Sequence, residues 1–244
     1  MNSPTLRLAM WSGPRNISTA MMRSWGNRPD TAVWDEPLYA CYLAKTNRGH
    51  PGAAEVIAHD ETDCRKVIAR ILAEVPGGKP IFFHKQMAQH LLPEIDRGWL
   101  AEVTNCFLIR DPGEMLTSFV KQVPDVTLAD TGLPQQVEIF EQVRQATGTI
   151  PPVLDARDVL QNPRAMLGRL CEAVGVPFRE EMLSWPPGPR ATDGIWAKYW
   201  YAAVEQSTSF HPYRPKTEPV PAHLHTLHEQ CLEFYEQLFM HRLT

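Results

Sequence analysis

The stretch Val103–Arg110, VTNCFLIR, contains a run of four apolar residues, Cys106–Ile109. A strand with one face in solvent alternates apolar and polar residues, so this unbroken run predicts a strand buried on both faces. Such strands occur in parallel sheets that helices cover on both sides. The run therefore favours an α/β fold with a central parallel sheet.

Four further stretches have the length and composition of strands. They are Leu6–Ser12, Thr31–Glu36, Pro80–Lys85 and Pro151–Ala156. Helical patterns follow the first strand and cover about Glu61–Glu74, a stretch from Pro112, Leu133–Thr147, about Pro163–Val174 and about Ala222–Met240. Strands that alternate with helices predict a three-layer α/β fold with a five-stranded, mostly parallel sheet flanked by helices.

Two segments lack a regular pattern. Cys41–His59 contains Gly and Pro and is expected to be a loop. Trp185–Thr217 is rich in Pro, Gly and aromatic residues, which favours an irregular segment that covers a site. No internal repeat is visible, so residues 1–244 are expected to form a single domain with a C-terminal helix.

Charge and cysteine pattern narrow the class of protein. The formal net charge of the 244 residues is -4, which gives no reason to expect nucleic-acid binding. Five dispersed cysteines without a C-x-x-C pair are typical of reduced thiols in the cytosol. Without a signal-peptide pattern or a membrane-spanning apolar run, a cytoplasmic protein with no membrane partner is expected.

The sequence WSGPRNIST, Trp11–Thr19, joins the first strand to the first helix. Such a junction presents the free N–H groups and the positive dipole end of the helix, which suit an anion. Arg15 adds a forked cation that matches phosphate. The alternative is an ordinary capped helix with a surface arginine. The other turn and donor residues of the candidate site are Gly13, Pro14, Asn16, Ser18 and Thr19.

A second stretch, LIRDPGEMLTSF, ends the fourth strand at Arg110 and opens a helix with Asp111-Pro112. Ser118 follows two turns into that helix. Because helical side chains point back toward the N-terminus, Ser118 and Arg110 are expected to converge on one anion. The alternative is a strand-end arginine that pairs with Asp111 or Glu114 on the surface.

Together these stretches resemble the sulfotransferase family that uses 3'-phosphoadenosine 5'-phosphosulfate (PAPS). The family's P-R-S-G-T-T-like loop for the 5'-phosphosulfate corresponds to Pro14–Thr19, with Ile17 in place of glycine. Its R-[ND]-P-x-x-x-x-x-S motif for the 3'-phosphate corresponds to Arg110–Ser118. A third family stretch is similar to DARDVLQNPRAMLGRLCEAVGVPF, Asp155–Phe178.

The resemblance implies a P-loop-type fold with PAPS as cofactor. The stretches WSGPRNIST, DEPLYA and DGIWAKYWYAAVEQSTSF resemble a subfamily with branched-chain-aminotransferase-like names, although no stretch indicates a pyridoxal phosphate site. Ile17 suits the loop only with a right-handed backbone, because a β-branched residue fits a positive φ poorly. The implied cofactor-binding residues are Gly13, Pro14, Arg15, Asn16, Ile17, Ser18, Thr19, Arg110 and Ser118.

Sulfuryl transfer needs a base for the acceptor and cations for the transferring and leaving groups. Glu36 is the expected base, because it ends the second strand, where ligand sites of open α/β sheets gather. Asp35 is expected to point to the opposite face of that strand. The resemblance implies that Lys85 assists transfer and that His84 is an alternative base, with Arg15 as a second charge stabiliser.

Other residues are secondary candidates. His90 is expected to line the acceptor pocket. The aromatic cluster Trp196–Tyr201 is expected either to cover the site or to pack against the sheet edge, and Lys198 within it is a candidate phosphate contact. The run His223, His225, His228 does not place three imidazoles on one helix face, so no metal site is expected.

Three functions stay open. The first is a PAPS-dependent sulfotransferase that acts on a hydroxyl or amine of a small-molecule acceptor. The second is a small-molecule P-loop kinase, which the missing lysine of the usual nucleotide loop disfavours. The third is a catalytically silent nucleotide-binding protein, which Ile17 keeps open. Neither the acceptor nor the oligomeric state follows from the sequence.

Overall fold

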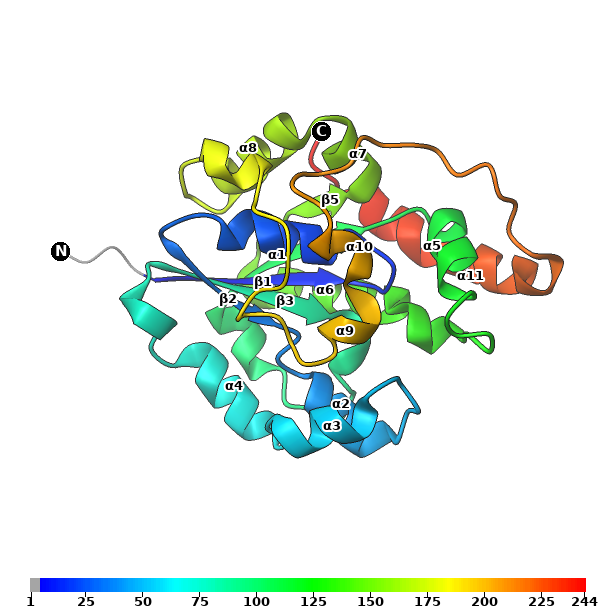
Figure 1. Ribbon diagram of the computed structural model, residues 1–244, viewed down its shortest axis with the longest axis horizontal. Helices are drawn as coiled ribbons and strands as arrows, with labels where there is room; N and C mark the ends of the chain where they lie inside the picture. The colour runs from blue at the N-terminus through cyan, green and yellow to red at the C-terminus, as the bar shows by residue number, and fades with distance from the viewer. Residues whose placement is uncertain (1–4) are drawn as a thin grey trace.

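The computed structural model describes residues 5–244 and has three layers, with helices on both faces of a five-stranded sheet (Figure 1). The order across the sheet is β2-β3-β1-β4-β5, and every one of its strand pairs is parallel. The strands are β1 Leu6–Ser12, β2 Thr31–Asp35, β3 Ile81–Met87, β4 Thr104–Ile109 and β5 Val153–Asp155. The predicted α/β class and five strands are confirmed, and the sheet is parallel throughout.

Helices connect the strands and close the chain. They are α1 Ser18–Gly26, α2 Tyr39–Thr46, α3 Ala53–His59, α4 Cys64–Leu72, α5 Pro112–Phe119, α6 Leu133–Thr147, α7 Ala156–Gln161, α8 Pro163–Ala173, α9 Ala197–Trp200, α10 Ala202–Glu205 and α11 His225–Phe239. Within residues 5–244, no helix is both long and apolar enough to cross a membrane.

Alternate residues of β1 divide the interior into two apolar cores. Leu8 and Met10 face the core that α1 and α8 cover, whereas Ala9 and Trp11 face the core that α4, α6 and α11 cover. Successive side chains of a strand point to opposite faces, so one central strand supplies both cores. Figure 1 shows α1 and α8 above the sheet and α4 below it.

The expectation of a loop over Cys41–His59 is wrong, because this segment contains α2 and α3. Cys41 and Val56 are fully buried, so both short helices are held by packing that local sequence does not reveal. Asn47 ends α2 with φ 52° and Gly52 precedes α3 with φ 76°. The Gly that suggested a loop therefore marks a helix boundary.

Gly13, at the end of β1, lies against the backbone of the 3-10 turn Leu128–Thr131. A Cβ on Gly13 would lie 2.4 Å from the carbonyl oxygen of Thr131, so Gly13→Ala forces the loop to shift. We expect this substitution to lower the free energy of unfolding by about 1–3 kcal/mol in urea denaturation.

Gly168→Ala is the matched control for that measurement. Gly168 lies inside α8, and apart from its chain neighbours and the backbone of its own helix, nothing among residues 5–244 lies within 4 Å of the position that its methyl group would take. Alanine there adds helix propensity without a clash, so we expect the free energy of unfolding to increase by about 0.5–1 kcal/mol. A Gly13→Ala variant that is at least as stable as the wild type would contradict the close approach at Gly13.

Candidate functional site

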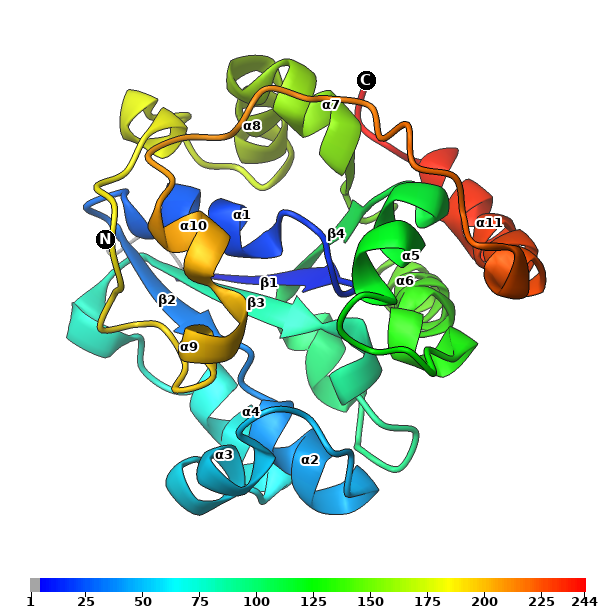
Figure 2. The same ribbon diagram turned by 45° about the vertical axis from the view of Figure 1, so that its right-hand side comes forward.

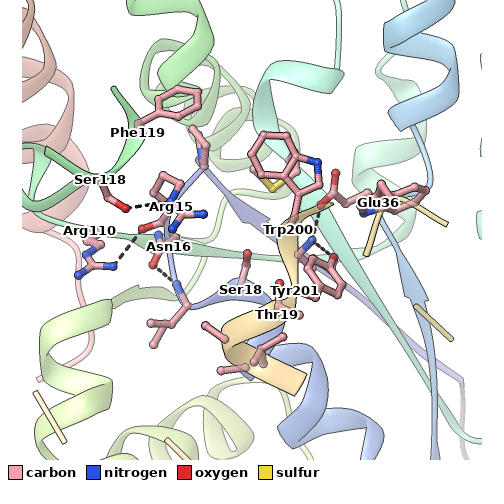
Figure 3. Close-up of a pocket in the computed structure, with 18 of the residues that line it drawn as sticks. Arg15, Asn16, Ser18, Thr19, Glu36, Arg110, Ser118, Phe119, Trp200 and Tyr201 are labelled. Atoms are coloured by element: carbon pink, nitrogen blue, oxygen red, sulfur yellow. Dashed lines mark hydrogen bonds and ion pairs between the residues drawn. The ribbon is translucent and has the colours of Figure 1, made fainter. Parts of the chain in front are cut away.

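A cavity of about 340 Å³ opens where β1, β2, β3 and β4 end (Figure 3). One end is lined by Pro14–Thr19 together with Arg110 and Ser118. Glu36, Trp200 and Tyr201 lie toward the other end. The carboxyl edge of an open parallel sheet is the usual place for a ligand site, and here the edge carries cations at one end and carboxylates at the other.

The loop at the basic end enters α1 with an unusual backbone. Arg15 has φ 54°, a left-handed conformation that is uncommon outside glycine, whereas Ile17 has φ -90° and ψ 20°. Ile17 therefore avoids the conformation that would exclude it, and its side chain packs partly into the core beside α1. The glycine-to-isoleucine departure is compatible with this loop because Arg15 makes the tight turn instead.

Arg15, Arg110 and Ser118 meet, as their motifs predict. The Arg15 Nε donates to Ser118 Oγ at 2.9 Å, and the Arg110 Nη1 donates to the Arg15 carbonyl at 3.0 Å. Arg110 also pairs with Glu114 at 3.0 Å, which was the alternative for this residue. Burial, together with the neighbouring Arg110 guanidinium, lowers the pKa of Arg15. Two adjacent guanidiniums at the start of a helix create a site that an anion stabilises.

The opposite end centres on the buried ammonium of Lys85. Its Nζ donates to Asp35 Oδ1 at 3.0 Å, to the Tyr201 hydroxyl at 2.8 Å and to Glu36 Oε1. The expectation that Asp35 points away from Glu36 is wrong, because Glu36 has φ 40° and turns its side chain to the same ammonium. The alternation of a regular strand ends at Asp35.

Burial sets the protonation of this cluster. Burial raises the pKa of the Glu36 carboxyl, an effect that the Lys85 ammonium partly offsets and the Asp35 carboxylate increases. Burial alone would lower the pKa of Lys85, but Asp35 and Glu36 outweigh it and hold that pKa well above its ordinary value. Lys85 is therefore a permanent cation, and Glu36 is a carboxylate with increased affinity for a proton.

His84, predicted as an alternative base, lies outside the cavity. Lys85 and Met87 face the cavity, so the pleat of β3 turns His84 to the other face of the sheet. There its ring centroid lies 4.1 Å from that of Phe82, and neither ring nitrogen has a hydrogen-bond partner among residues 5–244. This position rules out direct contact between His84 and a ligand in the cavity.

Two other expected residues have different positions. Lys198 is exposed and donates to Glu55 at 2.6 Å, so its side chain does not line the cavity. Gly13 lies beneath the loop, where its lack of a side chain permits the approach of Thr131. The remaining predicted loop residues, Pro14, Arg15, Asn16, Ile17, Ser18 and Thr19, all line the cavity.

His90 lines the cavity, as expected, in an aromatic stack. Its ring lies between Tyr39 at 4.8 Å and Tyr42 at 4.7 Å, measured between centroids. Burial lowers the pKa of His90 well below its ordinary value, so the imidazole beside Glu36 is neutral. The His90 Nδ1 lies 3.8 Å from Glu36 Oε2, which is too long for a hydrogen bond.

Sequence reasoning missed the roles of Asp35 and Tyr201. The Tyr201 hydroxyl donates to Asp35 Oδ2 at 2.7 Å across a sequence separation of 166 residues. No local pattern reports such a contact. The only sequence signal was the cluster of aromatic residues around Trp196–Tyr201, which predicted a covering segment without identifying the tyrosine that reaches inside.

The isolated imidazole of His84 makes stability depend on pH. Burial, with a contribution from Arg7, lowers the pKa of His84 from 6.5 to about 3. Between these values the unfolded chain binds a proton that the folded chain does not, so stability falls as the pH drops through that window. We expect His84→Phe to reduce the loss of unfolding free energy between pH 7 and pH 5 by about 2 kcal/mol, measured by urea denaturation at both values. An unchanged loss would contradict a neutral His84.

Comparison with known proteins identifies a matching family and related chains. A family model described as a sulfotransferase domain matches residues 6–241. Two relatives from Arabidopsis thaliana, named branched-chain-amino-acid aminotransferase-like proteins 2 and 1, are 36% and 34% identical over 231 residues. The match covers 95% of this chain but 41% of each relative, so the chain spans about two-fifths of their length.

Solved structures show the same fold at low identity. A sulfotransferase from Alicyclobacillus acidocaldarius has a TM-score of 0.53 at 11% identity, over 100% of this chain and 98% of that chain. The sulfotransferase domain of the Synechococcus PCC 7002 olefin synthase has a TM-score of 0.52 at 15% identity, over 100% and 98%. With a family match that runs from residue 6 to residue 241, the chain belongs to the sulfotransferase domain family.

Proposed function

We propose that this chain transfers a sulfuryl group from PAPS to a hydroxyl or amine of a small-molecule acceptor. The observation that carries the proposal is the polarity of the cavity. Arg15, Arg110 and the start of α1 form an anion site at one end, and the buried Lys85–Glu36 pair lies at the other. This arrangement suits a donor with two anionic groups and an acceptor that must lose a proton.

The residues of the basic end fit a donor of this kind. Arg15 and Arg110 are held together although both carry positive charge, and burial with that repulsion lowers the pKa of Arg15. An anion between them would remove the repulsion. By the family pattern, Arg110 and Ser118 would hold the 3'-phosphate, and Pro14–Thr19 the 5'-phosphosulfate, with N–H groups of the first turn of α1.

The residues of the acidic end supply the proton chemistry. PAPS, when bound, supplies an activated sulfuryl group. Glu36 would accept the proton of the acceptor, a role for which its raised pKa suits it. Lys85 has its three N–H groups on Asp35, Glu36 and Tyr201, so contact with a further oxygen requires it to leave one of them. If Lys85 gave up its hydrogen bond to Glu36, the Glu36 carboxylate would be free to accept the proton.

Binding of adenosine 3',5'-bisphosphate tests the donor site. We expect the wild-type protein to bind it in calorimetry, and Arg110→Ala to weaken binding about 10- to 100-fold, because a charged hydrogen-bond donor is lost. Arg164→Ala is the control, since Arg164 is an exposed arginine on α8 that pairs with Glu180.

Parallel titrations with ATP and GTP separate the alternatives. Binding of ATP with magnesium-dependent transfer, and no binding of the bisphosphate, would favour a small-molecule kinase. Wild-type affinity that Arg110→Ala leaves unchanged would overturn the assignment of the 3'-phosphate site.

Glu36→Gln tests the base. The amide keeps the shape of the side chain but cannot take the proton, so we expect turnover of PAPS with a panel of phenols, alcohols and amines to fall about 10²- to 10⁴-fold. Affinity for the bisphosphate should stay the same. Glu55→Gln, at an exposed position on α3, is the control. If the wild-type protein binds the bisphosphate but turns over no acceptor, and Glu36→Gln changes neither result, the protein is a catalytically silent binder.

A further inference from the structure

A segment far along the chain lies over the acidic end of the cavity. Gly194–Phe210, called here the covering segment, contains α9 and α10 and runs across the carboxyl edge of the sheet (Figure 2). Trp196, Tyr201 and Phe210 bury their rings in the core beside α1. The segment is therefore packed against the site, and its side chains form part of the cavity wall.

Two polar anchors hold the beginning of this segment, one at Asp193 directly before it and one at Gly194. Arg23 of α1 pairs with Asp193, with Nη2 and Oδ2 2.7 Å apart, and both side chains are buried. Asp35 Oδ2 accepts from the backbone N–H of Gly194 at 3.2 Å. The second anchor ends on a carboxylate that also holds Lys85. The covering segment is thus tied directly to the charged cluster.

Tyr201 makes the third attachment, and it is the one that reaches Lys85. Its buried hydroxyl donates to Asp35 Oδ2 at 2.7 Å and accepts from the Lys85 Nζ at 2.8 Å. Burial, with the Asp35 carboxylate, raises the pKa of Tyr201 well above its ordinary value, so the phenol keeps the proton that it donates. A phenylalanine here would leave one N–H of Lys85 without an acceptor and would remove one of the two donors to Asp35 Oδ2.

The two carboxylates on Lys85 are not equivalent. Asp35 accepts from Lys85, Tyr201 and the Gly194 N–H, so its charge is compensated by three donors. Glu36 accepts a side-chain hydrogen bond from Lys85 alone among residues 5–244. Asp35 is the anchor of the cluster, and Glu36 is the carboxylate whose second oxygen is available to the cavity.

We propose that Tyr201 is a positioning residue that couples the seating of the covering segment to the proton affinity of Glu36. The catalytic importance of this coupling rests on the proposed function, in which Glu36 is the base. The coupling itself is a property of the protein without ligand. With Tyr201 in place, Asp35 repels Glu36 less and Lys85 is held between both carboxylates. Without the hydroxyl, Asp35 loses one of its three donors, and its less compensated charge draws Lys85 toward itself and makes Glu36 hold a proton more tightly.

The surroundings of Glu36 make this effect measurable. The titratable groups that face it are Asp35 on β2, Lys85 on β3, Tyr39 on α2, His90 after β3, and Tyr201. Burial raises the pKa of both tyrosines and lowers that of His90, so these three groups are neutral near pH 7. The charge that Glu36 senses therefore comes from Asp35 and Lys85.

The test compares two tyrosines of one short stretch, Tyr201→Phe and Tyr199→Phe. Tyr199 is 43% exposed, and its ring lies beside the ammonium of Lys198, away from the cluster. The readout is the titration of the Glu36 carboxyl carbon by ¹³C NMR in the protein without ligand, assigned by the loss of its signal in Glu36→Gln. We expect Tyr201→Phe to raise the pKa of Glu36 by about 0.5–1 pH unit and Tyr199→Phe to leave it unchanged.

A double substitution establishes the route of the effect. If Tyr201 acts through the charge of Asp35, then Tyr201→Phe in an Asp35→Asn background produces no further shift. Should Tyr201→Phe fail to fold, Asp193→Asn provides a second test. It weakens the ion pair with Arg23 that holds the start of the covering segment, and it should also raise the pKa of Glu36. Titrations of Glu36 that match the wild type in both Tyr201→Phe and Asp193→Asn overturn the inference.

Activity separates this inference from the proposed function. In turnover of PAPS, the acid limb of the pH profile should move upward with the pKa of Glu36 in Tyr201→Phe, while affinity for adenosine 3',5'-bisphosphate stays unchanged. A shifted titration in a protein without any turnover would overturn the proposed function alone. Normal turnover with an unshifted titration would overturn the role of Tyr201 alone.

Discussion

The buried ammonium of Lys85 is the interaction on which the rest of the site depends. A charge taken out of water is tolerated only with close partners, and Lys85 has two carboxylates and a phenol. Those partners come from the end of β2 and from the covering segment, so one cation joins an edge strand, its neighbour β3 and a segment more than 100 residues away. Loss of the cation would leave Asp35 and Glu36 facing each other in the core.

Backbone strain is concentrated at the two ends of the same cavity. Among residues 5–244, the non-glycine residues with positive φ are Arg15, Glu36 and Asn47, and the first two line the cavity. A left-handed non-glycine residue costs about 1–3 kcal/mol, which surrounding contacts must offset. At Arg15 the contacts are Ser118 and Arg110, and at Glu36 the contact is Lys85. The two strained residues thus direct the Arg15 guanidinium and the Glu36 carboxylate into the same cavity.

Sequence reasoning recovered the parts of the molecule that local patterns specify. Leu6–Ser12 and Leu133–Thr147 were predicted with the bounds that the structure has, because apolar periodicity reports a buried face. Helix geometry predicted that Ser118 lies near the strand-end Arg110, and both residues line the same cavity. The errors at His84 and Asp35 have different causes. The resemblance implied a role for His84, but the regular alternation of β3 turns it away from the face that carries Lys85. At Asp35 the alternation fails, because φ becomes positive at Glu36. The contacts of Tyr201 could not be predicted, because Asp35 and Lys85 are distant from it in sequence.

The charge distribution along the cavity also determines how a polyanion would lie in it. Two guanidiniums and the N-terminus of α1 sit at one end, whereas the other end holds two carboxylates and one ammonium. The acidic end is net negative when Glu36 is ionised, so it repels the more highly charged part of a ligand toward Arg110. Only a part of the ligand that contacts Lys85 gains from the acidic end. The Asp35 charge, which adds to the effect of burial on the proton affinity of Glu36, would therefore also help to orient an anionic donor along the cavity.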